Sequence, residues 1–270
     1  MIEITSLEKT FEQPGGDVVP ALRGVSLTIP AGQFVSVIGS NGSGKSTILN
    51  VIAGTYLTDT GTIRIAGVDV TRWPEHRRAA LVGRVFQDPF KGTCPSMTVA
   101  ENLRMAELRG KRRGLRVGLD RASLERYREA LASLGMRLEG RLQASMGTLS
   151  GGQRQAVTLL MATLTRPDLL LLDEHTAALD PRSTEKVVQL TEEIIRKGGL
   201  TTLMVTHSMQ QALTLGDRVV LMHRGRIVES IGGAPKRQLR VEDLLASFDR
   251  IRNADLVDES AADMLRRLYV

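Results

Sequence analysis

The sequence has few aromatic residues, a single cysteine and no apolar run long enough to span a bilayer. Only 3% of its residues are aromatic although 42% are hydrophobic, so the core must consist mostly of aliphatic side chains and Met, which suits a parallel sheet covered by helices. A lone Cys94 excludes an internal disulfide and a cysteine-based metal cluster. The first residues lack the charged-then-apolar layout of a signal peptide, so we expect a cytosolic chain that reaches a membrane through a partner protein.

Basic residues outnumber acidic ones, and the net charge is +6. The densest basic run, residues 109–116, contains no aromatic side chain on which a nucleobase could stack, so we expect no nucleic-acid partner. Two alternatives remain for this run: a solvated surface loop, or a loop that lies near anionic lipid headgroups.

The spacing of apolar residues predicts an α/β fold. Alternation at 2–7 and 25–29 predicts strands with one buried face, and 62–70 is typical of a hairpin. Longer apolar runs predict buried strands, and helical stretches such as 184–195 separate them. These runs lie at 34–38, 169–172, 202–205 and 218–222. Strands that alternate with helices are typical of a parallel sheet.

Residues from about 90 to 146 combine helical patterns with many charges. We therefore predict one cassette over 1–235, in which residues from about 90 to 154 form a helical subdomain and residues 1–89 and 155–235 form the core lobe. The remaining residues, 236–270, are predicted to form a tail of two short amphipathic helices.

A glycine-rich loop follows the predicted strand at 34–38 and fits the P-loop pattern G-x-x-x-x-G-K-[ST]. Between a strand and a helix, such glycines let backbone N–H groups close around phosphate oxygens, and the helix N-terminus adds partial positive charge. Lys45 is expected to reach the β- and γ-phosphates of ATP, and the Ser46 hydroxyl to bind Mg²⁺. The alternative is a chance glycine-rich turn. The predicted ATP-binding residues of this loop are Gly39, Ser40, Asn41, Gly42, Ser43, Gly44, Lys45, Ser46 and Thr47.

Two carboxylates end the apolar run 169–172. Asp173 is expected to lie beside the P-loop and hold Mg²⁺ through water, and Glu174 to polarise an attacking water molecule. Alone, these residues could be ordinary surface acids. The P-loop expected in the same sheet favours the catalytic interpretation.

The segment Leu149-Ser-Gly-Gly-Gln153 precedes a predicted helix and forms a second phosphate-binding helix N-terminus; alone it could be a plain loop-to-helix turn. Together with the P-loop and the Asp-Glu pair, it makes the chain resemble the ABC (ATP-binding cassette) ATPases over nearly its whole length. The resemblance implies a P-loop NTPase (RecA-like) parallel-sheet core, an N-terminal antiparallel β subdomain and an α-helical subdomain that carries this signature. It also implies that the signature loop serves the ATP of a second copy in a head-to-tail dimer. The residues implied in that role are Ser150, Gly151, Gly152 and Gln153.

Four further residues match functional positions of the ABC family in sequence order. Gln87 matches the Q-loop glutamine that touches Mg²⁺ and the attacking water, and His207 matches the switch histidine at the γ-phosphate. Asp180 matches the D-loop at the dimer interface, and Phe11 matches the aromatic residue that stacks on adenine. Each has a structural alternative: a polar strand end, a structural histidine, a helix N-cap and a core aromatic, respectively. The predicted catalytic residues are Glu174, His207 and Gln87, and the predicted Mg²⁺ ligands are Ser46, Gln87 and Asp173.

One residue departs from the family pattern. His175 stands directly after Glu174, where proline is common in the family. Two interpretations stay open: His175 tunes the catalytic site, or it is a tolerated substitution.

The kind of ABC protein is suggested by what surrounds these motifs. The interval between P-loop and signature is short and the chain holds one cassette, which favours a transporter subunit over DNA-repair and translation ABC proteins. Residues 95–102 resemble the segment that meets a permease's coupling helix, although a simple capped helix start is the alternative. The run 148–181 resembles a bacterial importer group that works with a solute-binding protein and a permease, and some members are linked to tyrosine or tryptophan uptake.

That resemblance implies a position at the cytoplasmic face of the inner membrane, held there by the permease. An exporter subunit and a regulatory cassette with low turnover remain as alternatives. Both Glu174 and His207 are present, which favours an active ATPase over the regulatory cassette.

Overall fold

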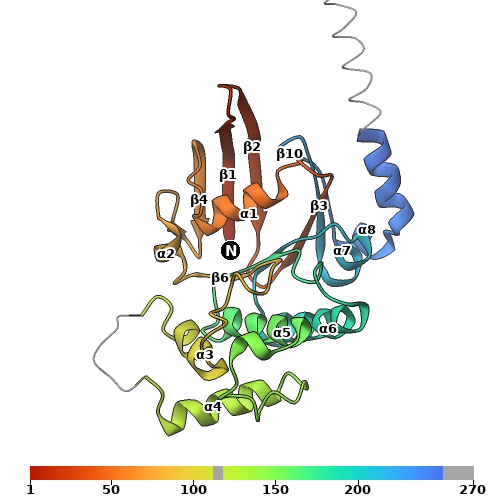
Figure 1. Cartoon of the computed structure of the whole chain (residues 1–270). Coiled ribbons are helices and arrows are strands. Elements are labelled where there is room, and N and C mark those ends of the chain that lie inside the picture. Colours follow the sequence, from red (N-terminus) through yellow and green to blue (C-terminus); the bar gives the residue numbers. More distant parts are fainter. Residues whose placement is uncertain (112–117, 252–270) are drawn as a thin grey trace, which may run out of the picture.

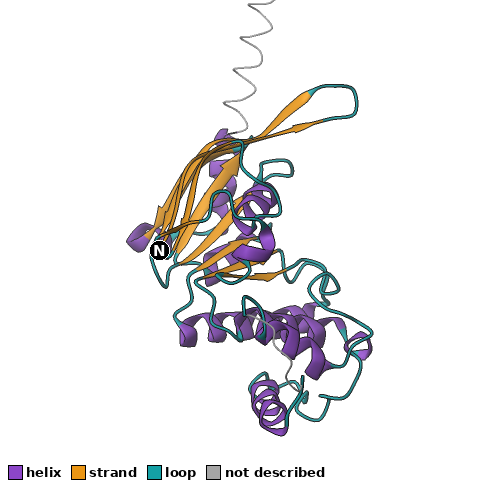
Figure 2. Cartoon of the chain, turned by 90° about the vertical axis from the view of Figure 1, so that its left-hand side faces the viewer, coloured by secondary structure: helices purple, strands orange, loops and turns teal. Residues whose placement is uncertain are grey.

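The computed structural model describes residues 1–111 and 118–251. Strands fill the upper part of the molecule in Figure 1, and a layer of helices lies beneath them. This lower layer consists of α3 (Val99–Glu107), α4 (Arg121–Ala132), α5 (Gly151–Thr163) and α6 (Pro181–Gly198). Figure 2 shows the same division from the side, with one hairpin projecting beyond the sheets.

The N-terminal region forms an antiparallel sheet with the strand order β2-β1-β4-β5. Its strands are β1 (Ile2–Glu12), β2 (Val18–Ile29), β4 (Thr60–Ile65) and β5 (Val68–Asp69). In β2, Val25, Leu27 and Ile29 are buried and the residues between them are exposed, as the alternation in the sequence predicts. Strands β4 and β5 pair antiparallel, which confirms the predicted hairpin.

The second sheet has the order β10-β9-β3-β8-β7-β6 and is parallel except for β10, which pairs antiparallel with β9. Its strands are β3 (Phe34–Gly39), β6 (Val82–Val85), β7 (Leu169–Asp173), β8 (Thr202–Val205), β9 (Arg218–His223) and β10 (Arg226–Gly232). The central strands are covered on both faces, which is why their sequences are continuous apolar runs. The α/β fold with a parallel sheet and an N-terminal antiparallel sheet is confirmed.

The strand order brings four chemically important segments to one edge of the parallel sheet. Strands β3, β8, β7 and β6 are neighbours that run in the same direction, so the residues that follow them leave the sheet at the same edge. In that order these residues are the P-loop, His207, the Asp173-Glu174 pair and Gln87. Segments far apart in the sequence thus meet in one row.

The remaining helices are α1 (Lys45–Ala53), α2 (Glu75–Arg78), α7 (Met209–Leu215) and α8 (Gly233–Gln238), with a 3-10 turn, η1, at Met146–Thr148. Local chemistry sets the helix starts. Thr98 and Glu101 form a reciprocal capping box at the start of α3, and Asp120 accepts the backbone N–H of Ser123 at the start of α4.

One hydrophobic cluster joins the helical layer to the parallel sheet. It includes Phe34 and Leu170 of the sheet together with Leu103 of α3, Leu131 of α4 and Leu159 of α5. Helix α5 also runs without a break across the boundary predicted at residue 154. The division into core lobe and helical subdomain therefore stays a prediction.

The C-terminal region begins with α8, and residues 241–251 are helical. Leu244 is buried in a small cluster with Ile38, Ala212 and Val219, so this helix packs beside β3, α7 and β9. The predicted tail beyond residue 251 and residues 112–116 of the basic run lie outside the described residues. Within 1–111 and 118–251, no helix is both long and apolar enough to cross a membrane.

Candidate nucleotide-binding site

The P-loop leaves β3 and enters α1 at the carboxyl edge of the parallel sheet. Gly44, the N-cap of α1, has a φ of 97°, a conformation that side-chain-bearing residues rarely adopt. A Cβ atom added to Gly44 would lie 2.6 Å from the carbonyl oxygen of Ala21, which is too close for any other residue. The loop is thus pressed against β2, and this contact fixes where the first N–H groups of α1 point.

Lys45 lies inside the P-loop and is only 7% exposed. Its Nζ donates to the carbonyl oxygens of Gly39 at 2.8 Å and Ser40 at 2.9 Å. Burial lowers the pKa of Lys45, and the nearby negative charge of Glu174 acts in the opposite direction. The buried hydroxyl of Ser43 has no hydrogen-bond partner among the described residues. A helix N-terminus, an ammonium group and an unpaired hydroxyl together suit the oxygens of a phosphate chain.

Asp173 ends β7 and faces Arg84 of the neighbouring strand β6. Arg84 Nη2 lies 3.2 Å from Asp173 Oδ2, and both side chains are largely buried. Burial raises the pKa of the Asp173 carboxyl above its ordinary value, and the Arg84 charge opposes this rise.

The predicted metal ligands Ser46, Gln87 and Asp173 offer a hydroxyl, an amide and a carboxylate oxygen. Ser46 and Gln87 are exposed, so both can take a ligand. Mg²⁺ prefers such oxygen donors and is commonly bound by one or two carboxylates together with substrate phosphates and water. The residues therefore fit Mg²⁺ bound with a nucleotide.

Glu174 and His207 form a direct pair at the edge of the sheet. His207 Nδ1 lies 3.1 Å from Glu174 Oε2, and the His207 side chain is 61% exposed. Glu174 has a φ of 42° in the left-handed region, while its backbone N–H donates to Val205 of β8 at 2.9 Å. Unusual backbone conformations of non-glycine residues concentrate at functional sites. Here the conformation directs the Glu174 carboxylate toward His207.

Two cavities flank this row of residues. The first, of about 620 Å³, is lined by Asn50, Arg84, Gln87 and Asp173 among others. The second, of about 430 Å³, is lined by residues that include Glu174 and His207. The structure therefore brings Gln87 together with Asp173, and Glu174 together with His207.

The signature loop starts α5 in the lower, helical layer, whereas α1 lies among the strands above (Figure 1). Ser150 is the N-cap of α5: its hydroxyl accepts the backbone N–H of Gln153, and the Gln153 side chain accepts the N–H of Ser150. A Cβ atom on Gly152 would lie 2.7 Å from Ser183 of α6, so glycine is needed where these helices touch.

Arg154 of α5 anchors the signature loop and the turn before it. This buried side chain donates to the carbonyl oxygens of Met146, Gly147 and Leu149 at 3.3, 3.0 and 3.0 Å. Its guanidinium also lies 3.7 Å from the centre of the Phe90 ring. Arg154 therefore connects the signature loop to the segment that follows Gln87.

Asp180 shows the structural contact that was its alternative, whereas Phe11 packs on an exposed tyrosine and not in the core. Asp180 is the N-cap of α6, and its Oδ1 accepts the N–H of Ser183 at 3.0 Å. The Phe11 ring packs edge-on against Tyr56 with centroids 5.2 Å apart. Neither contact conflicts with the predicted role, because Asp180 is exposed and Phe11 is only half-buried. Their roles at the interface and at adenine stay predictions.

His175 points into the protein and away from the row. Its Nε2 lies 3.0 Å from Thr191 Oγ1, whose hydroxyl donates to Val187 in α6. The Thr191 oxygen therefore accepts, and Nε2 carries the proton. Complete burial lowers the pKa of His175 to about 4. These contacts support the interpretation of His175 as a substitution accommodated in the core.

Sequence reasoning missed two arginines, Arg84 and Arg154. A charged residue inside the short apolar strand Val82–Val85 is the signal that could have singled out Arg84. Arg109, assigned to a basic surface loop or a lipid contact, instead donates to Ala162 and Thr165 of the helical layer. Burial lowers the pKa of Arg109.

The chain is similar to known proteins in sequence and in fold. The model of the ABC transporter family matches residues 22–177. A tyrosine transport ATP-binding protein of Clostridioides difficile (strain R20291) is 43% identical over 249 residues, covering 92% of this chain and 99% of the relative. A sulfate/thiosulfate import ATP-binding protein, CysA 2 of Chromobacterium violaceum, is 41% identical over 211 residues, covering 78% of this chain but only 54% of that longer relative.

Among solved structures, the dimeric ATP-binding cassette MJ0796 in a post-hydrolysis state with ADP and phosphate has a TM-score of 0.74 and 30% identity. The aligned region covers 86% of this chain and 98% of the MJ0796 chain. The fold and the phosphate-binding loop define a P-loop nucleoside triphosphatase. More narrowly, the chain belongs to the ABC transporter family, as an ATP-binding subunit that hydrolyses ATP.

The predicted family, fold class and ATPase activity are thereby confirmed. ATP-binding subunits of ABC transporters work as dimers with permease subunits, so a second copy and a permease are the partners of this chain. The roles of the individual site residues stay predictions.

Proposed function

We propose that this chain is the ATPase subunit of an importer and that two copies enclose Mg²⁺·ATP between the P-loop of one and the Ser150 loop of the other. The observation that supports this most is the row formed by the P-loop, the Glu174–His207 pair and Gln87 along one sheet edge. The row holds a phosphate cradle, a carboxylate and an imidazole, which are the groups that phosphoryl transfer to water requires.

The phosphate chain would be held by the N–H groups at the start of α1 and by Lys45. Ser46, Gln87 and Asp173 would hold Mg²⁺, which supplies positive charge at the β- and γ-phosphates. Lys45 already donates to the carbonyl oxygens of Gly39 and Ser40 at the start of the loop, so its ammonium is held in the cradle before nucleotide arrives. Little side-chain ordering then remains to be done on binding.

Glu174 would orient the attacking water and accept its proton as the oxygen attacks the γ-phosphorus and the bond to ADP breaks. His207 is placed to fix one oxygen of the Glu174 carboxylate, which leaves the other for water. A carboxylate held in one orientation can lose less entropy in the transition state than a free one.

The signature loop supports a composite site. Ser150 and Gly151 are exposed at the N-terminus of α5, in a different layer from the P-loop of the same chain. A helix N-terminus of this kind suits phosphate oxygens supplied by another subunit. Asp180 starts the adjacent helix α6, so the D-loop would meet the same partner surface.

A Glu174→Gln variant tests the catalytic assignment. We expect its steady-state ATPase rate to fall about a hundredfold or more, because an amide cannot accept the proton. ATP should also hold this variant as a dimer on size-exclusion chromatography, since the site can close but not turn over. An unchanged ATPase rate would show that Glu174 is not the catalytic base.

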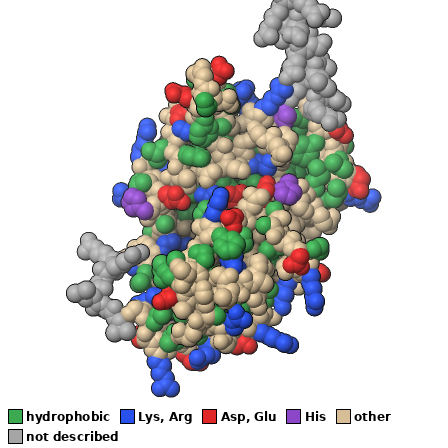
Figure 3. Space-filling model, viewed as in Figure 1, with side chains coloured by type: hydrophobic (Ala, Val, Ile, Leu, Met, Phe, Trp, Pro, Cys, Tyr) green, Lys and Arg blue, Asp and Glu red, His purple; other side chains and the backbone are tan. Residues whose placement is uncertain are grey.

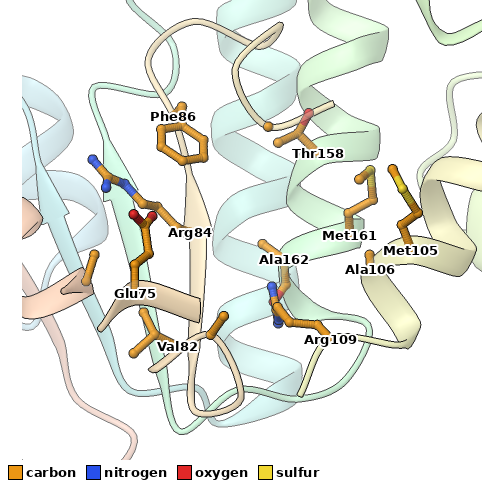
Figure 4. A pocket seen from close by; sticks show the side chains of 13 residues that line it. Glu75, Val82, Arg84, Phe86, Met105, Ala106, Arg109, Thr158, Met161 and Ala162 are labelled. Carbon is orange, nitrogen blue, oxygen red and sulfur yellow. The ribbon is translucent and has the colours of Figure 1, made fainter. Parts of the chain in front are cut away.

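The face toward the permease is proposed to include a groove of about 330 Å³ between β6 on one side and α3 and α5 on the other (Figure 4). Met105, Met161 and Ala106 line one side of this groove, and Met105 is 41% exposed. Methionine-rich surfaces adapt to a partner helix. Helix α3 carries Met105 and also the end of segment 95–102, which resembles the segment that meets a permease's coupling helix. In Figure 3, charged side chains follow the boundary between the strand-rich and helical parts on the face shown.

The cargo is proposed to be an amino acid of the tyrosine or tryptophan type, on the strength of the tyrosine transport relative. A solute-binding protein would deliver it, and the permease would hold this subunit at the cytoplasmic face of the inner membrane. Uptake of radiolabelled tyrosine by vesicles containing the assembled transporter tests both direction and cargo. ATP-dependent efflux, or uptake of no aromatic amino acid, would contradict this assignment.

A further inference from the structure

Arg84 is a charged residue within a strand whose other residues are largely buried. It lies on β6 and pairs with Leu171 of β7. Leu171 precedes Asp173 by two residues in that strand. Its side chain is 11% exposed, so its charge is largely removed from water. A largely buried guanidinium needs hydrogen-bonding or charged partners that offset the free-energy cost of its desolvation.

Those partners come from the two elements that carry the proposed metal ligands. Arg84 Nη2 lies 2.8 Å from Asn50 Oδ1 of α1 and 3.2 Å from Asp173 Oδ2 of β7. Its Nη1 lies 3.3 Å from Thr55 Oγ1, and its guanidinium lies 4.5 Å from the centre of the Phe86 ring. Arg84 therefore ties the strand of the metal carboxylate to the helix that follows the P-loop.

The position of Asn50 on α1 relates the Arg84 contact to the proposed metal ligand Ser46. Asn50 follows Ser46 by four residues, so both side chains occupy the same face of α1 one turn apart. Ser46 and Asp173 are the hydroxyl and carboxylate ligands proposed for Mg²⁺. Arg84 consequently links Asp173 to α1 at Asn50, one helical turn after the hydroxyl ligand Ser46.

Arg84 also lies in the wall between two cavities. It lines both the cavity that contains Gln87 and Asp173 and the groove beside Met105. In Figure 4 its guanidinium points away from Met105 and Met161, so the aliphatic stem faces the groove while the charged end reaches toward Asp173. An occupant of the groove would thus touch the residue that holds the carboxylate.

We propose that Arg84 is a positioning residue for the metal site, which holds Asp173 at a fixed distance from α1 so that Ser46 and Asp173 can share one Mg²⁺. This inference rests on the proposed function, because it takes Ser46 and Asp173 as the metal ligands. Residues that orient metal ligands typically change metal affinity 10–100-fold when they are removed.

The test is the Mg²⁺ dependence of binding of a fluorescent ADP analogue, which is not hydrolysed. For Arg84→Met we expect the Mg²⁺ concentration at half-maximal binding to rise about tenfold. Asn50→Ala should raise it in the same direction, because it cuts the tie at α1. Arg84→Lys should restore little, since a single ammonium lacks the planar fork that spans Asn50 and Asp173 together. Arg121→Met, an exposed arginine on α4, is the matched control and should leave the midpoint unchanged.

Two further measurements separate the possible failures. Binding of the analogue in EDTA should be equal for wild type and Arg84→Met, which shows that the nucleotide cradle itself is intact. Should Arg84→Met not fold, Asn50→Ala carries the test alone. If the midpoint stays within twofold of wild type or falls, Arg84 does not position the metal ligand. If Asp173→Asn also leaves the midpoint unchanged, the magnesium site of the proposed function is itself wrong.

Discussion

His207 Nδ1 lies 3.1 Å from Glu174 Oε2, although the two residues are 33 positions apart in the sequence. They meet because β7 and β8 are parallel neighbours and both residues follow the carboxyl ends of their strands. The sheet therefore brings the proposed catalytic pair together, and neither residue needs a long loop to reach the other.

The first prediction concerns this pair. His207→Ala should lower the ATPase rate about a hundredfold while leaving ATP affinity nearly unchanged, because the Glu174 carboxylate loses its orientation. Phosphate release measures the rate, and fluorescence titration measures the affinity. His223→Ala, at the last residue of β9, is the comparison. Equal activity of His207→Ala and wild type would mean that the 3.1 Å contact has no part in turnover.

The second prediction concerns Arg154. Arg154→Met removes hydrogen bonds to the carbonyl oxygens of Met146 and Gly147 in η1 and of Leu149 in the signature loop, and should lower the free energy of unfolding by about 2–3 kcal/mol. ADP binding should persist, because the P-loop lies in another layer. In the Glu174→Gln background, the ATP-held dimer should be lost. If that dimer survives, Arg154 supports the fold but not the signature loop.

The third prediction concerns His175 and pH. Burial lowers its pKa from 6.5 in the unfolded chain to about 4, so between these values only the unfolded chain takes up the proton. The stability of the folded chain should therefore fall as the pH drops from about 6.5 to 4, by about 3 kcal/mol in total from this residue. Urea unfolding at several pH values measures this. His175→Gln should flatten the decline and leave ATPase activity at neutral pH unchanged; a lower activity would support a tuning role.

The fourth prediction concerns the groove. Met105→Glu places a charge on the proposed permease surface and should prevent co-purification with the permease subunit. The ATPase activity of the isolated chain should not change, because Met105 lies outside the nucleotide cavities. Leu245→Glu adds the same charge at a similarly exposed position of the C-terminal helix and should keep the complex. Loss of the complex in both variants would point to charge alone as the cause.

Much of the fold could be predicted because its signals are local. The apolar runs of β7 and β8 are strands buried on both faces, and a glycine-rich loop before Lys45 has a fixed meaning between a strand and a helix. Helix α3 was similarly marked by the capping residues Thr98 and Glu101.

The rest depends on long side chains whose direction no sequence pattern encodes. Arg84 could have pointed to solvent or to Asp173, and only the pairing of β6 with β7 decides this. Arg109 belongs to a basic run in the sequence, yet its partner carbonyl, that of Ala162, lies 53 residues away. The burial of His175 follows from the packing of α6, which the residues around Glu174 do not reveal.

The close contact between Gly152 and Ser183 has a mechanical consequence. With a gap that would not admit even a methyl group, α5 and α6 cannot slide past one another freely. Their first residues, Ser150 and Asp180, are therefore carried on a single rigid block. When a second copy approaches or withdraws, the N-termini of α5 and α6 therefore move together. The chain presents Ser150 and Asp180 to the second copy as one rigid surface.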